Sequence, residues 1–156
     1  MTHETFMRAA IALSQNNVDD GTGGPFGAVV VRDGEIIGEG TNLVTSANDP
    51  TAHAEVVAIR QACERLGTYN LEGCVVYTSC EPCPMCLSAI YWARLDRIFY
   101  GNTKVDAAKI DFDDDFLYRE IPKPISERTI PTEQLLHDES IAAFDAWAKS
   151  EIKIPY

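Results

Sequence analysis

The chain has 156 residues, a length that suits one domain, and its 46% hydrophobic content can fill a core. Its net charge is −11, from 24 acidic and 13 basic residues. Because clustered Lys and Arg bind phosphate backbones, this balance disfavours nucleic acid and favours a small neutral or cationic substrate. No run is apolar enough to span a bilayer, and the N-terminus lacks a signal-peptide layout, so we expect a cytoplasmic protein without a membrane partner.

In the first half of the chain, apolar spacing predicts a helix, a hairpin and a second helix. The first helix covers about 2–16, and a glycine-rich stretch ends it. The hairpin has strands at 26–31 and 36–40, joined by the turn sequence Asp33-Gly34. A polar loop over 42–50 comes next. The second helix is expected from Thr51 or Ala52 to Leu66, where Gly67 stops it, with its buried face formed by Val56, Ile59 and Cys63.

In the second half, a buried strand is predicted over 74–78 and a short strand over 97–100. Between them lies a helix whose first turn holds Pro82. An acidic and aromatic loop over 111–116 and a proline-rich connection precede the last helix, about 132–149, whose apolar positions should be buried. This alternation indicates an α/β fold in a single domain, 1–156, with a central mixed sheet covered by helices on both faces.

Two short segments carry the chemistry: His53-Ala54-Glu55, and Cys83 with Cys86 some thirty residues later. One imidazole and two thiolates are three ligands for a zinc ion, which leaves the fourth position open for water. Each segment is predicted at the start of a helix. Because helix N-termini carry partial positive charge, two of them at one site lower thiolate pKa values and favour a bound hydroxide. Glu55 is then a carboxylate placed to move protons.

Three other interpretations of these cysteines compete with the open zinc site. Cys80 could be a fourth ligand and close the site as a structural zinc knuckle, but this gives Glu55 no role. An iron–sulfur cluster on Cys80, Cys83 and Cys86 needs a further cysteine soon after, where Ile90 stands. A redox pair of Cys83 and Cys86 leaves His53-Ala54-Glu55 unexplained.

These segments match the zinc deaminase signature, and the chain resembles the cytidine/deoxycytidylate deaminase superfamily over most of its length. Within that superfamily, the sequences 112–114 (Phe-Asp-Asp) and the terminal Tyr156 are similar to those of bacterial guanine deaminases. The resemblance implies a three-layer α/β/α fold with a mixed sheet of about five strands, and one Zn²⁺ per subunit. It also implies hydrolytic conversion of guanine to xanthine and ammonia.

The chemistry and the resemblance together assign expected roles to further residues. Glu55 takes a proton from the attacking water and delivers it to the base, and Asp114, with Asp113 as the alternative, accepts hydrogen bonds near C2. The expected contacts to a flat purine base are apolar walls at Phe26 and Trp92, a polar edge contact at Asn42, and the backbone amide of Ala54.

The resemblance also implies that the C-terminal segment, about 132–156, closes over an active site with Tyr156. That site belongs either to the same chain or to a partner subunit, and we expect a homodimer.

Other functions remain open on the sequence alone. A tRNA-specific adenosine deaminase shares the metal motif but needs a basic face for RNA. Deamination of cytosine, a pterin or another small heterocycle is compatible with the same motif. A zinc-stapled interaction domain without catalysis is the alternative that is not an enzyme, and the intact Glu55 argues against it.

Overall fold

The computed structural model describes residues 2–112 and 114–156, and the chain divides into two compact units, 1–118 and 119–156. The elements that lie wholly in the first unit are α1 (His3–Asp19), β1 (Gly27–Arg32), β2 (Glu35–Thr41), α2 (Val44–Ala47), α3 (Ala54–Leu66), β3 (Cys74–Cys80), α4 (Pro84–Trp92), β4 (Arg97–Asn102) and α5 (Lys104–Ala108). Helix α6 (Asp115–Glu120) spans the division between the units. The second unit contains a 3₁₀ turn, η1 (Ile125–Glu127), and helix α7 (His137–Lys149).

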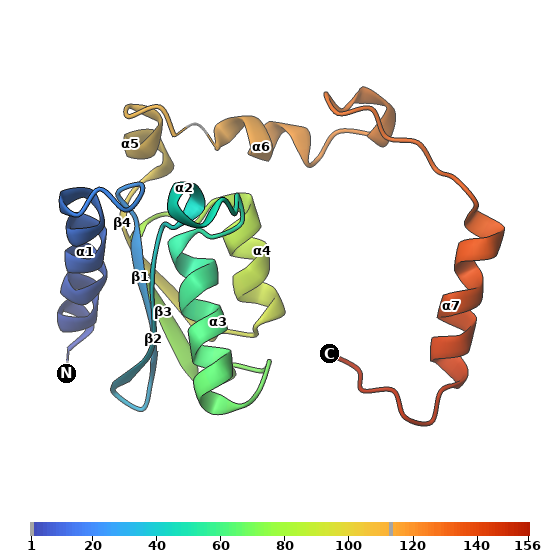
Figure 1. Cartoon of the computed structure of the whole chain (residues 1–156), viewed down its shortest axis with the longest axis horizontal. Helices are drawn as coiled ribbons and strands as arrows, with labels where there is room; N and C mark the ends of the chain where they lie inside the picture. The colour runs from blue at the N-terminus through green and yellow to red at the C-terminus, as the bar shows by residue number, and fades with distance from the viewer. Residues whose placement is uncertain (1, 113) are drawn as a thin grey trace. The chain divides into compact units, whose positions relative to one another are not determined.

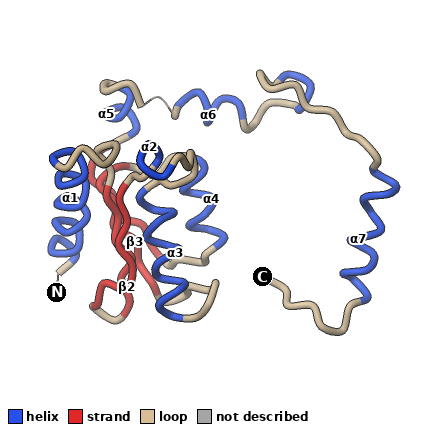
Figure 2. The backbone as a smooth tube through the Cα atoms, viewed as in Figure 1, coloured by secondary structure: helices blue, strands red, loops and turns tan. Residues whose placement is uncertain are grey.

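The first unit is built on one mixed sheet with the strand order β2-β1-β3-β4 (Figure 2). Strand β1 pairs antiparallel with both β2 and β3, and β3 pairs parallel with β4. The mixed sheet expected from the sequence is confirmed, with four strands among the described residues where about five were expected.

Helices cover both faces of this sheet, with α1 on one side and α3 and α4 on the other (Figure 1). Alternate residues of β1 point to opposite faces. Val29 and Val31 pack with Phe6 and Ala10 of α1, whereas Val30 packs in the cluster that contains the alanines of α3. The continuous apolar run in β1 therefore fills two cores at once.

Glycines in β2 let helix α3 lie directly on the sheet. A Cβ atom at Gly38 would lie 2.3 Å from the Ala58 carbonyl oxygen, and one at Gly40 would lie 2.0 Å from that of Ala54. Ala54, Ala58 and Ala62 are each 0% exposed and face the sheet. The predicted buried face of Val56, Ile59 and Cys63 is therefore only partly correct. All three side chains are half-buried, and Ile59 and Cys63 pack against this core, but the alanines make the close contact.

Most predicted elements lie within a few residues of the observed ones, and the differences are local. Gly67 ends α3 in the left-handed conformation as expected, with φ of +63°. Helix α4 begins at Pro84, with Cys83 as its cap, so Pro82 lies before the helix and not in its first turn. The last helix begins at His137, later than the predicted 132. Helix α2 lies within the predicted 42–50 loop, and α6 begins inside the predicted 111–116 loop and continues beyond it.

The second unit buries none of its residues, all of which the structure describes. On α7, Phe144 is 74% exposed and Trp147 is 49% exposed, and in the tail Ile152 is 91% exposed. Within this unit the apolar positions of the last helix stay exposed, so their burial stays a prediction. No helix in the described ranges is long and apolar enough to cross a membrane.

Candidate active site

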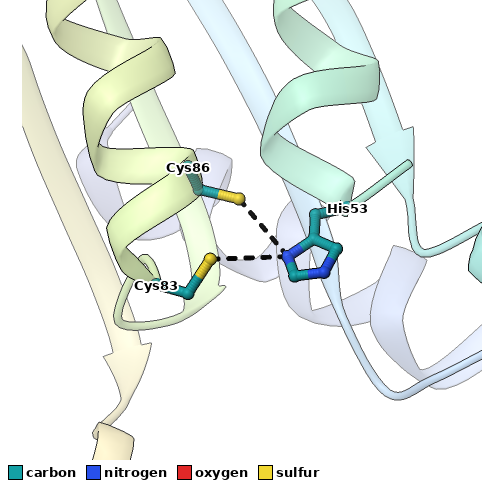
Figure 3. A group of neighbouring side chains, drawn as sticks. All are labelled: His53, Cys83 and Cys86. Carbon is teal, nitrogen blue, oxygen red and sulfur yellow. Dashed lines mark hydrogen bonds between the residues drawn. The ribbon is translucent and has the colours of Figure 1, made fainter. Parts of the chain in front are cut away.

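Three metal-ligating side chains converge at the N-termini of α3 and α4. His53 caps α3, Cys83 caps α4, and Cys86 lies in the first turn of α4. The Sγ atoms of Cys83 and Cys86 each lie 3.5 Å from Nδ1 of His53 (Figure 3). All three candidate ligand atoms lie within 4.8 Å of one another. The expected grouping of His53, Cys83 and Cys86 is thus present in the fold.

The spacing of these atoms fits a tetrahedral zinc ion. Zn–N and Zn–S bonds of about 2.05 and 2.3 Å at a tetrahedral angle place nitrogen and sulfur about 3.5 Å apart. Both measured distances from His53 Nδ1 to sulfur are 3.5 Å. One imidazole and two thiolates make three protein ligands, the number found in catalytic zinc sites that keep a position for water.

Cys83 and Cys86 interact closely with each other, which lowers the pKa of one thiol and raises that of the other. The interaction with the Cys86 side chain is the main reason that the pKa of the Cys83 thiol falls to about 4. The same interaction is the main reason that the pKa of the Cys86 thiol is raised. A bound metal ion would require both side chains as thiolates. The helix N-terminus at α4 supports the thiolates electrostatically.

Cys80 stands apart from the metal ligands. Its Sγ atom lies 3.8 Å from the Thr103 carbonyl oxygen, and it is not part of the cluster of ligand atoms. Burial raises the pKa of the Cys80 thiol to about 11, so this side chain stays protonated. This geometry favours an open site over the closed knuckle with Cys80 as fourth ligand.

Glu55 lies one helical position after Ala54 and is only 6% exposed. Burial raises the pKa of its carboxyl group above the usual value. The Thr78 hydroxyl lies 3.3 Å from Oε1 of Glu55, and both residues are buried between α3 and β3. Glu55 lines the same pocket as His53 and Cys83, which is the position a proton-transferring carboxylate requires.

A pocket of about 430 Å³ opens beside these residues, within the first unit. Its polar lining includes Glu55, Asn42 and Asp114, and its aromatic lining includes Phe26 and Phe112. The two phenylalanine rings meet edge to face, with centroids 4.8 Å apart and an interplanar angle of 89°. This combination of aromatic side chains and a few polar groups suits a planar heterocycle.

Asp114 presents an unused acceptor to this pocket. Its Oδ1 atom is buried and has no hydrogen-bond partner in the part of the chain that the structure describes. Burial is the main reason that the pKa of its carboxyl group is raised. A buried polar atom without a partner is costly, so a ligand that donates a hydrogen bond here would relieve that cost.

The pocket does not include every residue that the sequence singled out. Ala54 is fully buried behind it. Trp92 is 68% exposed and lines a separate surface groove with Ser88, Tyr91 and Arg94. Tyr156 belongs to the second unit, and Asp113 lies outside the described residues.

Sequence reasoning missed several residues that line the pocket. Phe112 was used only as part of the 112–114 motif, and the sequence did not predict that its ring lines the pocket together with Phe26. Its position beside Asp114 in an acidic, aromatic loop was the available signal. The other lining residues outside the predicted set are Gly24, Val44, Thr45, Pro50, Cys80, Glu81, Ala107, Asp111 and Leu117.

Comparison with known proteins agrees with the fold and the site. Residues 1–102 match the family described as the cytidine and deoxycytidylate deaminase zinc-binding region. The chain is 56% identical to a guanine deaminase of Bacillus subtilis (strain 168) over 156 residues, which is 100% of both chains. The crystal structure of the B. subtilis guanine deaminase superposes with a TM-score of 0.98, at 56% identity, covering 100% of this chain and 99% of that one.

A tRNA-specific adenosine deaminase of Aquifex aeolicus is more distant. It is 41% identical over 101 residues, which are 65% of this chain and 66% of the relative.

The fold and the site define a zinc-dependent hydrolase. The chain belongs to the cytidine and deoxycytidylate deaminase family, whose zinc-binding region it contains. Its cofactor is a zinc ion, for which His53, Cys83 and Cys86 are the group of candidate ligands.

Proposed function

We propose that this enzyme hydrolyses guanine at C2 to give xanthine and ammonia. The observation that carries the proposal is the 56% identity to a guanine deaminase over the whole chain. By contrast, the match to the A. aeolicus tRNA deaminase covers only 65% of the chain. The net charge of −11 also fits a small base better than an RNA.

In the proposed reaction, Glu55 moves the protons. A bound zinc supplies a water that is acidic enough to ionise near neutral pH. Glu55 accepts the proton of this water as its oxygen adds to C2, and delivers the proton to a ring nitrogen. The carboxylate then takes the second proton from the new hydroxyl group at C2 and gives it to the amino group, so that the C2–N bond breaks, ammonia leaves and the C2 carbonyl of xanthine forms. Because Glu55 is buried beside the metal ligands, it can act at each step without ligating the metal.

The pocket residues hold the base for this chemistry. The Phe26 and Phe112 rings form the apolar wall against which the purine lies. Asn42 contacts an edge of the ring, and the Ala54 amide donates toward the oxygen at C6 from the start of α3. Asp114 accepts hydrogen bonds from N1–H or from the departing amine, with the buried Oδ1 atom as acceptor.

Replacing Asp114 with asparagine should lower kcat/KM for guanine by about 100-fold or more, because an oriented acceptor at the reacting centre becomes a mixed donor and acceptor. Steady-state assays with guanine measure this loss, and zinc analysis should still find one ion per chain. Asp115→Asn, one residue along the chain, is the matched control and should retain near-wild-type turnover. Near-native activity of Asp114→Asn would remove Asp114 from the site.

We also propose that the enzyme is a homodimer in which the segment 132–156 covers the active site of the partner subunit. The apolar face of α7 supports this, since Phe144 and Trp147 stay exposed within one chain. A proline-rich connection, 122–131, permits exchange of the segment between subunits. Tyr156 then lies over the partner's base.

Deleting residues 152–156 should lower kcat/KM for guanine by at least about tenfold, because the lid that excludes water is lost. The zinc content should not change. Mixing this truncated chain with a full-length Glu55→Gln chain tests the exchange. In a mixed dimer, the site with the intact Glu55 receives the intact tail of the other subunit, so activity should reappear. No effect of the deletion would contradict the lid, and no recovery on mixing would contradict the exchange.

An ammonia-release panel tests the proposed substrate. The zinc-loaded enzyme is offered guanine, adenine, cytosine, guanosine, cytidine and a tRNA anticodon stem. We expect guanine to give the highest kcat/KM. Activity on the stem without activity on guanine would contradict the proposal. We expect a small purine base and a second copy of the chain to be the only partners. The five cysteines form no disulfide, which fits a cytoplasmic location.

A further inference from the structure

The buried side chain of Asn17 forms hydrogen bonds to two residues that line the substrate pocket, although Asn17 itself does not line it. Asn17 lies near the end of α1 and is 4% exposed. Its Nδ2 group donates to the Gly24 carbonyl oxygen at 2.8 Å and to the Asn42 carbonyl oxygen at 3.0 Å. Gly24 and Asn42 both line the pocket, whereas Asn17 does not. One buried amide therefore fixes two lining residues that are 18 positions apart in the sequence.

The bonds of Asn42 explain why this matters for substrate. Its backbone amide donates to the Phe26 carbonyl oxygen at 3.2 Å, and its Oδ1 atom accepts from the Val44 amide at 3.3 Å. Asn17 holds the remaining backbone group, the carbonyl. The Nδ2 group of Asn42 is then the one polar group of this residue that makes no hydrogen bond to another described residue. It is the group that can donate to the edge of a base.

The packing leaves the Asn42 backbone no room on the side of the glycine-rich loop. A Cβ atom at Gly23 would lie 2.2 Å from the Asn42 carbonyl oxygen and 3.2 Å from Nδ2 of Asn17. The loop, the α1 amide and Asn42 thus pack as one unit. A side chain that cannot donate removes the described hydrogen bond to the Asn42 carbonyl. It also leaves the Gly24 carbonyl with only the Phe26 amide as a donor, at 2.8 Å, so that the loop and Asn42 can shift.

We propose that Asn17 is a positioning residue for substrate binding, which sets the place of Asn42 and of the wall at Gly24 relative to the metal ligands. The proposal rests on the proposed function, in which Asn42 contacts the base. Asn17 touches neither the base nor the metal ligands, so its loss should weaken binding and leave the chemical step largely intact.

The test compares Asn17→Leu with Asn16→Leu. Leucine has the same branched shape as asparagine and favours helix, but it is larger and cannot donate. Asn16 is the exposed neighbour on the same helix and does not line the pocket. For Asn17→Leu we expect KM for guanine to rise about tenfold and kcat to change less than about threefold. Zinc analysis should still find one ion per chain, and calorimetry should show weaker binding of xanthine. Asn16→Leu should match wild type in every measurement. Thermal melting checks that both variants are folded, and Asn17→Ala, which removes the donor without adding volume, replaces Asn17→Leu if that variant does not fold.

A double-mutant cycle with Asn42→Ala separates positioning from a general effect on the fold. If Asn17 acts through Asn42, adding Asn17→Leu to Asn42→Ala should raise KM by less than about twofold more, because the interaction is already lost. An unchanged KM in folded Asn17→Leu, or additive effects in the cycle, would overturn the proposal. Wild-type enzyme that does not turn over guanine would instead contradict the proposed function, so the two failures are distinguishable.

Discussion

Replacing Glu55 with glutamine should lower kcat for guanine by about 10⁴-fold, the upper end of what general acid–base catalysis contributes. The expected loss is large because one carboxylate carries each proton transfer in the proposed reaction. Glutamine keeps the size and the burial of the side chain but cannot accept and return a proton. Single-turnover assays with guanine measure the chemical step, and zinc analysis should give the wild-type content because Glu55 is not in the group of metal ligands.

Glu64→Gln is the matched control for this variant. Glu64 lies on the same helix, α3, but is exposed and does not line the pocket. The control should keep wild-type kcat and zinc. If Glu55→Gln loses its zinc together with its activity, then Glu55 is a ligand and the proposed proton transfer is wrong. A kcat within tenfold of wild type would also contradict it.

Replacing Cys83 with alanine should abolish both zinc binding and guanine turnover. Loss of a residue that only supports a metal ligand weakens the affinity for the metal by about 10- to 100-fold. Loss of a ligand itself should therefore weaken the affinity for zinc by more than about 100-fold. The remaining His53 and Cys86 are too few to hold a zinc ion in a stable site. Metal analysis after gel filtration and titration with a zinc-sensitive chelator measure the affinity.

Cys80→Ala tests the competing closed site in the same experiment. Because Cys80 contacts the Thr103 carbonyl and lies outside the cluster of ligand atoms, this variant should keep its zinc. In a closed knuckle, Cys80→Ala would lose zinc as Cys83→Ala does. Equal loss of zinc in the two variants would therefore show four protein ligands and leave no position for an attacking water.

Local sequence signals were sufficient to predict the sheet and its main helices. The apolar run over 26–31, the Asp33-Gly34 turn and Gly67 located β1, β2 and the end of α3. The buried face of α3 could not be predicted, because hydrophobicity favours Val56 and Ile59 over small residues. The contact is instead set by the lack of a side chain at Gly38 and Gly40, and this depends on which strand lies beneath the helix. Only the tertiary fold contains that information.

The metal site was predictable because its ligands come from two short motifs whose residue types and spacing determine the chemistry. The pocket was less predictable than the metal site, because its lining residues come from segments far apart in the chain. Phe112 and Asp114 reach it from the loop after α5, and no spacing rule relates them to His53. Asn17 had no sequence signal at all, because its role depends on two backbone carbonyls that only the fold brings near it.

The measurement that tests the central claim most directly is guanine turnover in water enriched in ¹⁸O, with xanthine analysed by mass spectrometry and ammonia counted in parallel. Zinc-dependent hydrolysis predicts one ¹⁸O atom in each xanthine and one ammonia per xanthine. It also predicts loss of both products on chelation, with recovery when zinc is returned. Zinc-loaded enzyme that releases no ammonia from guanine, or xanthine without ¹⁸O, would contradict the account.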